Sequence, residues 1–380
     1  MTIAALSAPL VVNGRFLQRP VTGVERVAME LLRALARRTG TEDAPALRLL
    51  LPHGPGGLDL PDLERRFSPA WLPGGHLWEQ LALPFESPGS TLINFANSAP
   101  LLRARQCVFV HDAAIFDIAD NFTTPYRWWY RALYACLQRT PAIVCTVSEF
   151  SKERLEHHLP RFAGRVKVIQ PGVDHIWRTP AAKGVPESLG LEQGRFVLAV
   201  GSQARHKNQD LMLKVAKGVG ELGLKVALVG GSRTNVFRGG GESEAPNVVR
   251  LGYVDDSTLR SLYASAFAFV FPSLHEGFGL PPLEAMALGC PTIVSKIRPL
   301  TEHCAGGALQ IDPYSSADLL TALRRLQDPH VRRDVSAEGV ARAAQFTWDA
   351  AAGQLIKLLL DEHAPGALAR QSLPFESQSA

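Results

Sequence analysis

The sequence predicts an α/β protein with two doubly wound domains that face each other across a cleft. Short runs that are apolar throughout recur along the chain, and amphipathic segments separate them. A chain of 380 residues is also too long for one comfortable hydrophobic core. Fully apolar runs are typical of strands buried on both faces of a parallel sheet, and alternating strands and helices build such sheets.

Eleven short runs rich in Val, Ile, Leu and Phe are the expected strands. In the first half of the chain they lie at 46–52, 90–97, 107–114, 142–148 and 166–172. In the second half they lie at 196–202, 224–231, 248–254, 267–273, 291–295 and 308–313. Amphipathic helices are expected between them at 23–38, 208–222 and 316–327. In doubly wound folds ligands bind at the carboxyl ends of the strands, so we expect the chemistry there.

The break between the domains is expected near 174–194, a stretch rich in Pro, Gly and polar residues that leads into a new strand. This predicts an N-terminal domain over 1–176 and a C-terminal domain over 177–346. A helix over 347–361 is expected to pack back toward the N-terminal domain, and 362–380 is expected to form a tail.

Composition excludes several classes of protein. The formal net charge of +4 is too small to predict a nucleic-acid partner. The five cysteines are scattered, which argues against zinc and for buried thiols in a reducing compartment. No basic leader precedes the first apolar run, and no uncharged apolar run approaches the roughly 20 residues of a membrane-spanning helix. We therefore expect a cytoplasmic protein without a signal peptide.

The stretch HEGFGLPPLEAMALGCP at 275–291 is expected to follow a strand and to end as a helix. Its two prolines suit a first helical turn, where the missing N–H groups are not needed. Gly277 and Gly279 let the backbone approach a ligand closely. The amides around Gly279 and Leu280 would then point at a group above the helix start, which is a typical phosphate site.

Glu276 and Glu284 lie on either side of this predicted phosphate site. Carboxylates repel phosphate, so these two should face neutral diols, whose hydroxyls they can bind. A diol, a diphosphate and a second diol in that order describe a nucleoside diphosphate sugar. We expect Glu276 to hold the hexose and Glu284 the ribose. The alternative is a capping box formed by Ser273 and Glu276, but Gly-Phe-Gly-Leu-Pro-Pro prevents a helix from starting at 274.

This stretch resembles the E-x7-E element of retaining glycosyltransferases of the GT-B fold, family 4 (glycosyltransferase group 1). Further motifs are similar to the subgroup that builds bacterial surface polysaccharides. They are TGVERVAMELLRAL (22–35), WEQLALP (78–84), VFVHDAAIF (108–116), TVSEFSKERL (146–155), VIQPGVD (168–174), VGSQARHKNQDLML (200–213) and LGYVDDSTLRSLYASAFAFVFPS (251–273). The resemblance implies that the N-terminal domain binds the acceptor and the C-terminal domain binds the nucleotide-sugar donor.

The resemblance also implies the catalytic residues His111, Glu276 and Lys207. His111 would lie by the sugar ring, and Lys207, with Arg205 nearby, would neutralise the donor diphosphate. The full set of expected donor-binding residues is Gly23, Ser202, Arg205, Lys207, Tyr253, Glu276, Gly277, Phe278, Gly279, Leu280 and Glu284. Many members carry arginine at the place of His206 here, one step after Arg205, and some carry arginine at the place of Ser202.

Each of these assignments has a plainer alternative. Lys207 could be a solvated surface residue, His111 and Asp112 could satisfy a loop, and Gly23 could form a turn before a helix. A metal-binding DxD motif would be a rival to the lysine, but Asp255-Asp256 is an adjacent pair that reads better as a helix N-cap. We therefore expect no metal or other cofactor.

The expected function is transfer of a hexose to a glycan or a polyprenyl-linked saccharide, with mannose from GDP-mannose as the favoured example. The family explains retention by a front-face reaction in which the departing phosphate helps to deprotonate the acceptor. The alternatives are a nucleotide-sugar epimerase on the same fold, glycoside hydrolysis by the two glutamates, and a non-catalytic nucleotide-sugar-binding protein.

The segment DNFTTPYRWWYRALYACLQRT at 120–140 predicts a helix that is both basic and aromatic. Such a helix can lie in a membrane interface, which would suit a lipid-linked acceptor at the inner face of the cell membrane. The alternative is a core helix of the first domain or a wall of the acceptor site.

Overall fold

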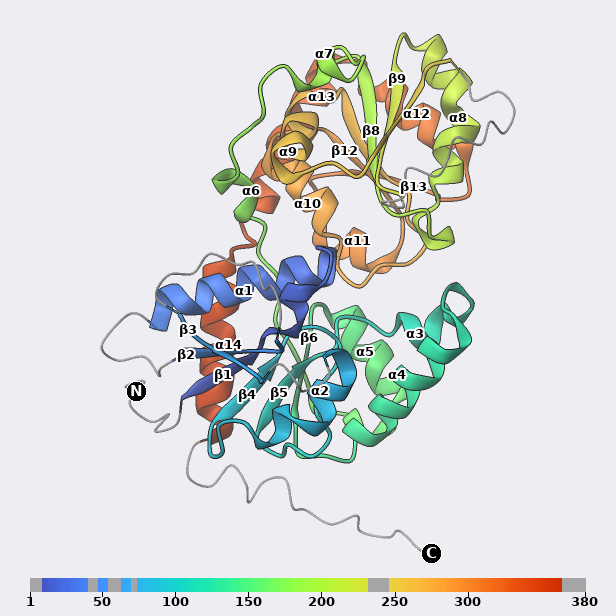
Figure 1. The fold of residues 1–380 in the computed structure, drawn as a ribbon. Coiled ribbons are helices and arrows are strands. Elements are labelled where there is room, and N and C mark those ends of the chain that lie inside the picture. Colours follow the sequence, from blue (N-terminus) through green and yellow to red (C-terminus); the bar gives the residue numbers. More distant parts are fainter. Residues whose placement is uncertain (1–8, 40–46, 54–62, 70–73, 232–245, 364–380) are drawn as a thin grey trace, which may run out of the picture.

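The computed structural model describes residues 9–39, 47–53, 63–69, 74–231 and 246–363. Two parallel sheets, each flanked by helices, form the two halves of the molecule (Figure 1). The predicted fold class is therefore confirmed. Most of the predicted tail, 362–380, lies outside the described residues.

The first sheet has the strand order β3-β2-β1-β4-β5-β6-β7. Its strands are β1 Leu10–Asn13, β2 Leu47–Leu51, β3 Glu64–Phe67, β4 Thr91–Asn94, β5 Gln106–Phe109, β6 Ile143–Thr146 and β7 Val166–Val168. All neighbouring strands pair in parallel. The order reverses between β1 and β4, which makes the loops after these two strands the switch point of this sheet.

The second sheet has the strand order β10-β9-β8-β11-β12-β13. Its strands are β8 Phe196–Val200, β9 Lys225–Val229, β10 Val248–Gly252, β11 Ala268–Phe271, β12 Thr292–Ser295 and β13 Leu309–Ile311. They also pair in parallel. Here the switch point lies between β8 and β11.

Helices connect the strands of each sheet. In the first half they are α1 Gly23–Thr39, α2 Gly75–Leu81, α3 Ala114–Asp117, α4 Thr124–Leu137 and α5 Glu149–His158. The connection and the second half contain α6 His175–Arg178, α7 Val185–Ser188, α8 Gln209–Glu221, α9 Asp256–Ser265, α10 Leu280–Ala287, α11 Arg298–His303, α12 Ser316–Arg325 and α13 Pro329–Ala343. The last helix is α14 Trp348–His363. Among the described helices, none is long and apolar enough to cross a membrane.

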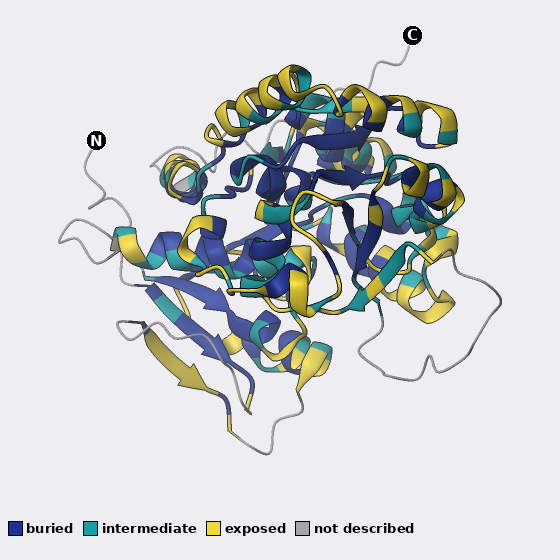
Figure 2. Cartoon of the chain, turned by 90° about the horizontal axis from the view of Figure 1, so that it is seen from above, coloured by how far each residue is buried: buried dark blue, intermediate teal, exposed yellow. Residues whose placement is uncertain are grey.

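All eleven predicted strands are present, and the sequence patterns missed two others. β1 has only four residues, LVVN, yet all four are buried at the centre of the first sheet. β3 has the opposite character, because its residues ERRF are all exposed at the edge of that sheet. A pattern search for apolar runs overlooks a polar edge strand, since only backbone pairing with β2 defines it. Figure 2 shows the buried strands and the exposed outer faces of the helices.

The chain passes between the two halves twice, and the two passages touch. The N–H of Val173 donates to the carbonyl of Phe346 at 3.0 Å. A Cβ on Gly172 would lie 2.1 Å from the backbone nitrogen of Trp348, so only glycine fits there. α14 then lies against α1, where Arg38 forms an ion pair with Asp349 at 2.6 Å (Figure 1). We propose that the N-terminal domain ends at residue 176 and the C-terminal domain at residue 346.

Candidate active site

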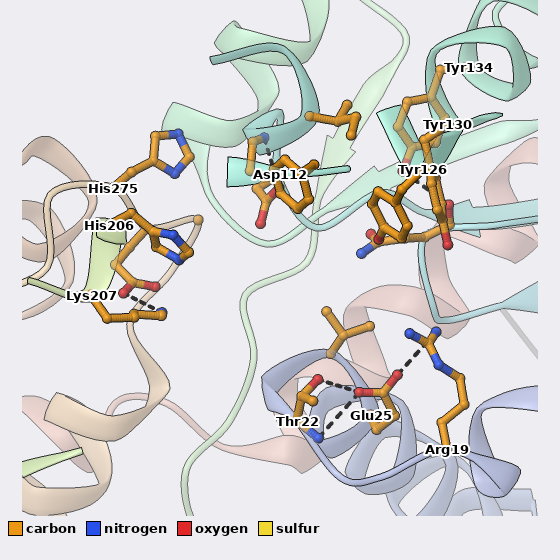
Figure 3. A pocket seen from close by; sticks show the side chains of 17 residues that line it. Arg19, Thr22, Glu25, Asp112, Tyr126, Tyr130, Tyr134, His206, Lys207 and His275 are labelled. Carbon is orange, nitrogen blue, oxygen red and sulfur yellow. Dashed lines mark hydrogen bonds and ion pairs between the residues drawn. The ribbon is translucent and has the colours of Figure 1, made fainter. Parts of the chain in front are cut away.

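A cavity of about 330 Å³ lies where the switch points of the two sheets meet. That volume is at the lower end of the roughly 300–1,000 Å³ usual for small-molecule sites. Its lining comes from the first half, Arg19, Thr22, Val24, Glu25, Asn97, Asp112, Ala114, Ile115, Phe122, Tyr126, Tyr130 and Tyr134, and from the second, His206, Lys207, His275, Glu276 and Gly277. Figure 3 shows the basic side chains of the second half across the cavity from the three tyrosines.

Lys207 lies in the loop after β8, at the end of a short 3₁₀ turn, Arg205–Lys207. Asn208 follows in the left-handed conformation with a φ of 51°. The side-chain amide of Asn208 donates to the carbonyls of Pro272 and Pro313 at 3.0 and 2.8 Å, which ties this turn to the loop after β11. The Lys207 ammonium consequently lies 2.6 Å from Oε1 of Glu276 and 5.5 Å from the centre of the Phe271 ring.

Gly277 joins the two halves at the edge of the cavity. Its carbonyl accepts hydrogen bonds from the hydroxyls of Ser148 and Ser151 at 2.6 and 3.3 Å. A Cβ on Gly277 would lie 3.0 Å from both the Cβ of Asp112 and the carbonyl oxygen of His111. The loop after β11 therefore rests on the loop after β5, and a side chain at this glycine would push the two apart.

α10 begins at Leu280 with Gly279 as its N-cap, and a proline occupies its first turn. This confirms the predicted helix start and removes the capping-box alternative. The φ of Gly279 is 99°, and a Cβ there would lie 2.5 Å from Leu300. The predicted N-cap at Asp255 is likewise confirmed, because its carboxylate accepts from the N–H of Thr258 at 2.7 Å.

Glu284, in α10, is buried and lies outside the cavity lining. Its two carboxylate oxygens accept hydrogen bonds from His175 at 3.0 Å and from the hydroxyl of Tyr263 at 3.2 Å. Burial raises the pKa of the Glu284 carboxyl, but the bond from His175 and the charge of Arg26 outweigh it and hold that pKa below its usual value. Glu276 and Glu284 therefore do not lie on either side of one glycosidic bond, which is the arrangement that a glycoside hydrolase requires of its two carboxylates.

The contact of Trp348 defines the tautomer of His175. The indole N–H of Trp348 can only donate, and it lies 3.1 Å from Nδ1 of His175. Nδ1 is therefore the acceptor, and the N–H of Nε2 donates the hydrogen bond to the Glu284 carboxylate. Glu284, His175 and Trp348 form one buried chain of hydrogen bonds at the place where the polypeptide crosses between the halves.

His111 follows β5 and is also buried. Its Nε2 donates to the carbonyl of Phe95 at 2.7 Å, so Nδ1 is left as an acceptor. Burial lowers the pKa of the His111 imidazole, which makes the ring neutral at pH 7. The neighbouring Asp112 lines the cavity, while His111 lies outside the lining.

Two family models match the chain. The model "Glycosyltransferase Family 4" matches residues 21–176, and the model "Glycosyl transferases group 1" matches residues 185–342. The chain belongs to this family of GT-B glycosyltransferases. The first model covers α4, which carries the tyrosines, and the second covers the sheet whose loops carry Lys207 and Glu276.

Named relatives and solved structures agree with this membership. The glycosyltransferase is 28% identical over 374 residues to the O-antigen chain mannosyltransferase B of Escherichia coli, covering 89% of this chain and 95% of the relative. It matches the structure of sucrose-phosphate synthase from Thermosynechococcus elongatus with a TM-score of 0.68 at 20% identity, over 94% of this chain and 99% of that one. It also matches Anabaena Alr3699/HepE in complex with UDP and glucose, with a TM-score of 0.67 at 17% identity, over 93% and 99%.

The other residues predicted for the donor site fall into two groups. Ser202, Arg205, Tyr253 and Gly23 are exposed and lie outside the cavity lining. Phe278 and Leu280 are buried, and the Phe278 ring packs on His303 with a centroid distance of 4.2 Å. In the glycosyltransferase, the cavity thus brings together Lys207, Glu276 and Gly277 of the predicted set.

Several lining residues escaped sequence analysis. Glu25 forms a capping box with Thr22 at the start of α1 and an ion pair with Arg19 at 3.2 Å. The T-x-x-E spacing would have predicted the helix start but not its position in the cavity. Asn97, with a φ of 61°, accepts the N–H of His111 at its side-chain oxygen. No local pattern indicates that contact, because it joins the loops after two different strands.

Proposed function

We propose that this glycosyltransferase transfers a hexose from a nucleoside diphosphate sugar to a glycan or a lipid-linked saccharide, with retention of anomeric configuration. Mannose from GDP-mannose is the first donor to test, because an E. coli relative over most of the chain is named an O-antigen chain mannosyltransferase. The structural neighbour that holds UDP and glucose supports a nucleotide-sugar donor.

One observation carries the proposal. Lys207, Glu276 and Gly277 meet in a single cavity at the switch points of both sheets. A cation for the phosphates, a carboxylate for the hydroxyls and a glycine that allows close approach are what a sugar diphosphate requires. Lys207 would stabilise the negative charge that develops on the leaving diphosphate, and Glu276 would bind hydroxyls of the transferred hexose. Glu284 lies outside this cavity with both carboxylate oxygens bonded, so to bind the ribose it would have to exchange His175 or Tyr263 for a ribose hydroxyl.

The chemical step needs no protein nucleophile. The bond between the anomeric carbon and the diphosphate oxygen breaks, and the acceptor oxygen bonds to the same face of that carbon. The acceptor proton passes to the departing diphosphate. The protein contributes positioning and charge stabilisation. His111, neutral and buried behind the lining, would hold the loop that carries Asp112 beside the sugar ring.

We also propose that transfer needs no metal ion, with Lys207 providing the positive charge. The test is the transfer rate in an excess of EDTA over any added magnesium. An unchanged rate is expected, and a rate that is lost in EDTA and restored by Mg²⁺ would overturn this part.

The competing functions differ in their products. None of the relatives and solved structures named above is an epimerase. An epimerase would convert the sugar of the donor without an acceptor. A hydrolase would release free sugar, and a non-catalytic binding protein would release nothing. Proton NMR of a reaction with donor and a glycan acceptor separates them, because only the proposed enzyme yields a new glycoside with the donor's anomeric configuration.

The donor itself is best found by thermal shift. A ligand that binds only the native protein raises its melting temperature, so GDP-, UDP- and ADP-sugars can be ranked directly. GDP-mannose is expected to produce the largest rise. If no nucleotide sugar raises the melting temperature, the proposed function is wrong.

A membrane contact through 120–140 at the cytoplasmic face remains a proposal. In α4, Trp128 is 70% exposed and lies beside Arg127 and Arg131, which suits an anionic lipid surface. Flotation with phosphatidylglycerol vesicles at low salt is the test. Binding that Trp128→Ala abolishes is expected, and no flotation of the unmodified protein would exclude it.

A further inference from the structure

The half of the cavity opposite Lys207 is aromatic. Tyr126, Tyr130 and Tyr134 lie at i, i+4 and i+8 of α4, so they share one face of the helix, and that face lines the cavity. The ring centroids of Tyr126 and Tyr130 are 4.5 Å apart, and the ring of Phe122 stacks on Tyr126 at 5.4 Å. Figure 3 shows this row facing Lys207 and His206, with Asp112 between them.

This aromatic row suits a sugar ring. A pyranose has an apolar C–H face and a rim of hydroxyls, so it packs on aromatic rings while its rim forms hydrogen bonds. Tyr126 is 41% exposed and offers both a ring and a hydroxyl. Asp112 and Asn97 line the same space and can bind hydroxyls of a second sugar beside the transferred hexose.

The charges at this end disfavour an anion. Arg19 is held by the buried carboxylate of Glu25 at 3.2 Å, and Lys207, at the other end, is held by Glu276. Asp112 adds a further carboxylate to the lining. At this end, Glu25 and Asp112 therefore place two carboxylates against the one guanidinium of Arg19. A phosphate monoester would meet this negative excess without an unpaired cation to bind it.

Of the two histidines in the lining, His206 carries no charge and His275 is already engaged by a carboxylate. Burial, together with the nearby ammonium of Lys207, lowers the pKa of His206, so this ring is neutral at pH 7. His275 bonds to the carboxylate of Asp117 at 3.3 Å, and Asp117 is also held by Arg154 and His158. That cluster joins the two halves, since His275 comes from the second half and Asp117 from the first.

We propose that the tyrosine-lined end of the cavity is the acceptor subsite and that it selects an uncharged pyranose over a phosphorylated one. The inference rests on the proposed function, since it assigns an acceptor to the same cavity. It adds the class of acceptor, a neutral sugar residue at the end of a glycan, and the residues that impose this choice, Tyr126, Asp112 and the Arg19–Glu25 pair.

The test is saturation-transfer NMR of the full chain with matched pairs of ligands. The neutral probes are the methyl α-glycosides of mannose, glucose, galactose and N-acetylglucosamine, and each is compared with its own 6-phosphate. At least one neutral glycoside is expected to bind, with a Kd at least about tenfold below that of its 6-phosphate. Tighter binding of the phosphates, equal binding, or no binding of any neutral probe would each overturn the inference.

Two variants and one control locate the binding. Tyr126→Ala should raise the Kd of the neutral probe by about tenfold, since it removes the exposed ring. Tyr126→Leu, which keeps an apolar side chain, serves as a second variant if the first is poorly folded. Phe85→Ala removes an aromatic ring that is 70% exposed and outside the cavity, so it should leave the Kd unchanged. Equal effects of Tyr126→Ala and Phe85→Ala would contradict the assignment.

Glu25→Gln tests the charge argument separately. Glutamine can still accept the N–H and hydroxyl of Thr22 in the capping box, so the start of α1 is preserved. Arg19 loses its counter-ion and becomes available to phosphate. The ratio of the two Kd values should therefore fall toward one, and an unchanged ratio would exclude the role of this pair.

Failure of this inference can be told from failure of the proposed function. Nucleotide binding, measured by thermal shift, depends on the opposite end of the cavity. If nucleotide sugars bind and neutral glycosides do not, the function stands and the acceptor class is wrong. If neutral glycosides bind at Tyr126 and no nucleotide sugar binds, the subsite stands as a sugar site and the transfer function is wrong.

Discussion

Lys207 and Glu276 come from the two loops at the switch point of the second sheet, and their side chains form an ion pair with Nζ 2.6 Å from Oε1. The pair lines the cavity and is only partly exposed. It holds the cation in place before a donor arrives. A diphosphate would take over the ammonium, and the freed carboxylate would then bind hydroxyls of the sugar.

Lys207→Met tests this arrangement through the transfer reaction. It removes the cation and leaves Glu276 facing the diphosphate, so kcat/KM should fall by about 10²–10³. The measurement is initial transfer rates with the donor selected by thermal shift. Lys217→Met on the exposed side of α8 is the matched control and should leave the rate unchanged. A Lys207→Met enzyme with more than half of the activity would exclude the proposed role.

His175→Phe tests the buried chain that links Glu284 to Trp348. The phenylalanine leaves the Glu284 carboxylate and the Trp348 indole N–H without this partner, so the free energy of unfolding should fall by about 2–4 kcal/mol. Urea unfolding measures the loss. Trp348→Phe removes the indole donor and part of the buried ring, and should cost less than His175→Phe. The reverse order would show that packing of the indole, not the hydrogen-bonded chain, dominates.

Glu79→Ala tests the buried polar cluster beneath the loop that carries Asn97. Glu79 accepts from Asn13 at 2.8 Å and Ser98 at 2.9 Å, and it pairs with Arg15 at 3.4 Å. Removing it leaves a buried guanidinium uncompensated, so the free energy of unfolding should fall by about 3–5 kcal/mol.

The matched control for that variant is Glu64→Ala. Glu64 lies on the exposed edge strand β3 and pairs with Arg48 of the neighbouring strand. Such surface ion pairs contribute at most about 1 kcal/mol to the free energy of unfolding. Similar losses for the two variants in urea unfolding would contradict the importance of the buried cluster.

The pH dependence of stability should have two separate windows. Burial lowers the pKa values of His111 and His303 in the folded state, so the unfolded chain binds more protons below the ordinary histidine pKa of 6.5. The free energy of unfolding should therefore fall as the pH drops below about 6.5. Asp117 and Glu284 have lowered carboxyl pKa values, so their stabilisation is present above their unfolded values of 3.8 and 4.5 and is lost only at lower pH.

Urea unfolding at pH 7.5, 6.5 and 5.5 checks the first window, because the carboxylates stay ionised throughout that range. His303→Gln removes one of the three imidazoles with a lowered pKa, the others being His111 and His206, and should reduce the fall between pH 6.5 and 5.5. A steeper fall in this variant, or a rise in stability toward pH 5.5 in the unmodified protein, would show that the sign is wrong.

The sequence predicted the structure correctly where residues close together in the chain decide it. The start of α10 follows from Gly279 and the prolines after it, and the N-cap of α9 follows from Asp255. The eleven apolar runs became strands because such runs can be buried on both faces of a sheet. The sequence did not predict β3, because the charged residues of β3 form a strand only through backbone pairing with β2.

The same distinction holds within the site. The pattern at 275–291 identified Glu276 and Glu284, and the resemblance to family 4 named Lys207 and His111. Neither indicated that His111 is buried against Phe95 and Glu284 against His175. The tyrosines of α4 were noticed in the sequence as aromatic residues. Their periodicity could not say whether that helix face meets a membrane, a core or a cavity.

The amino-acid sequence by itself determined the apolar runs that become strands, the helix that starts after Gly279 and the chemical types placed at the strand ends, because these depend on residues close in the chain. Only the tertiary structure decided which of these side chains share a cavity. Arg19, Tyr126 and Lys207 are far apart along the chain, and the packing of two sheets across the contact of Gly277 with Ser148 brings them together. That packing arises from non-local burial, which local sequence patterns do not encode.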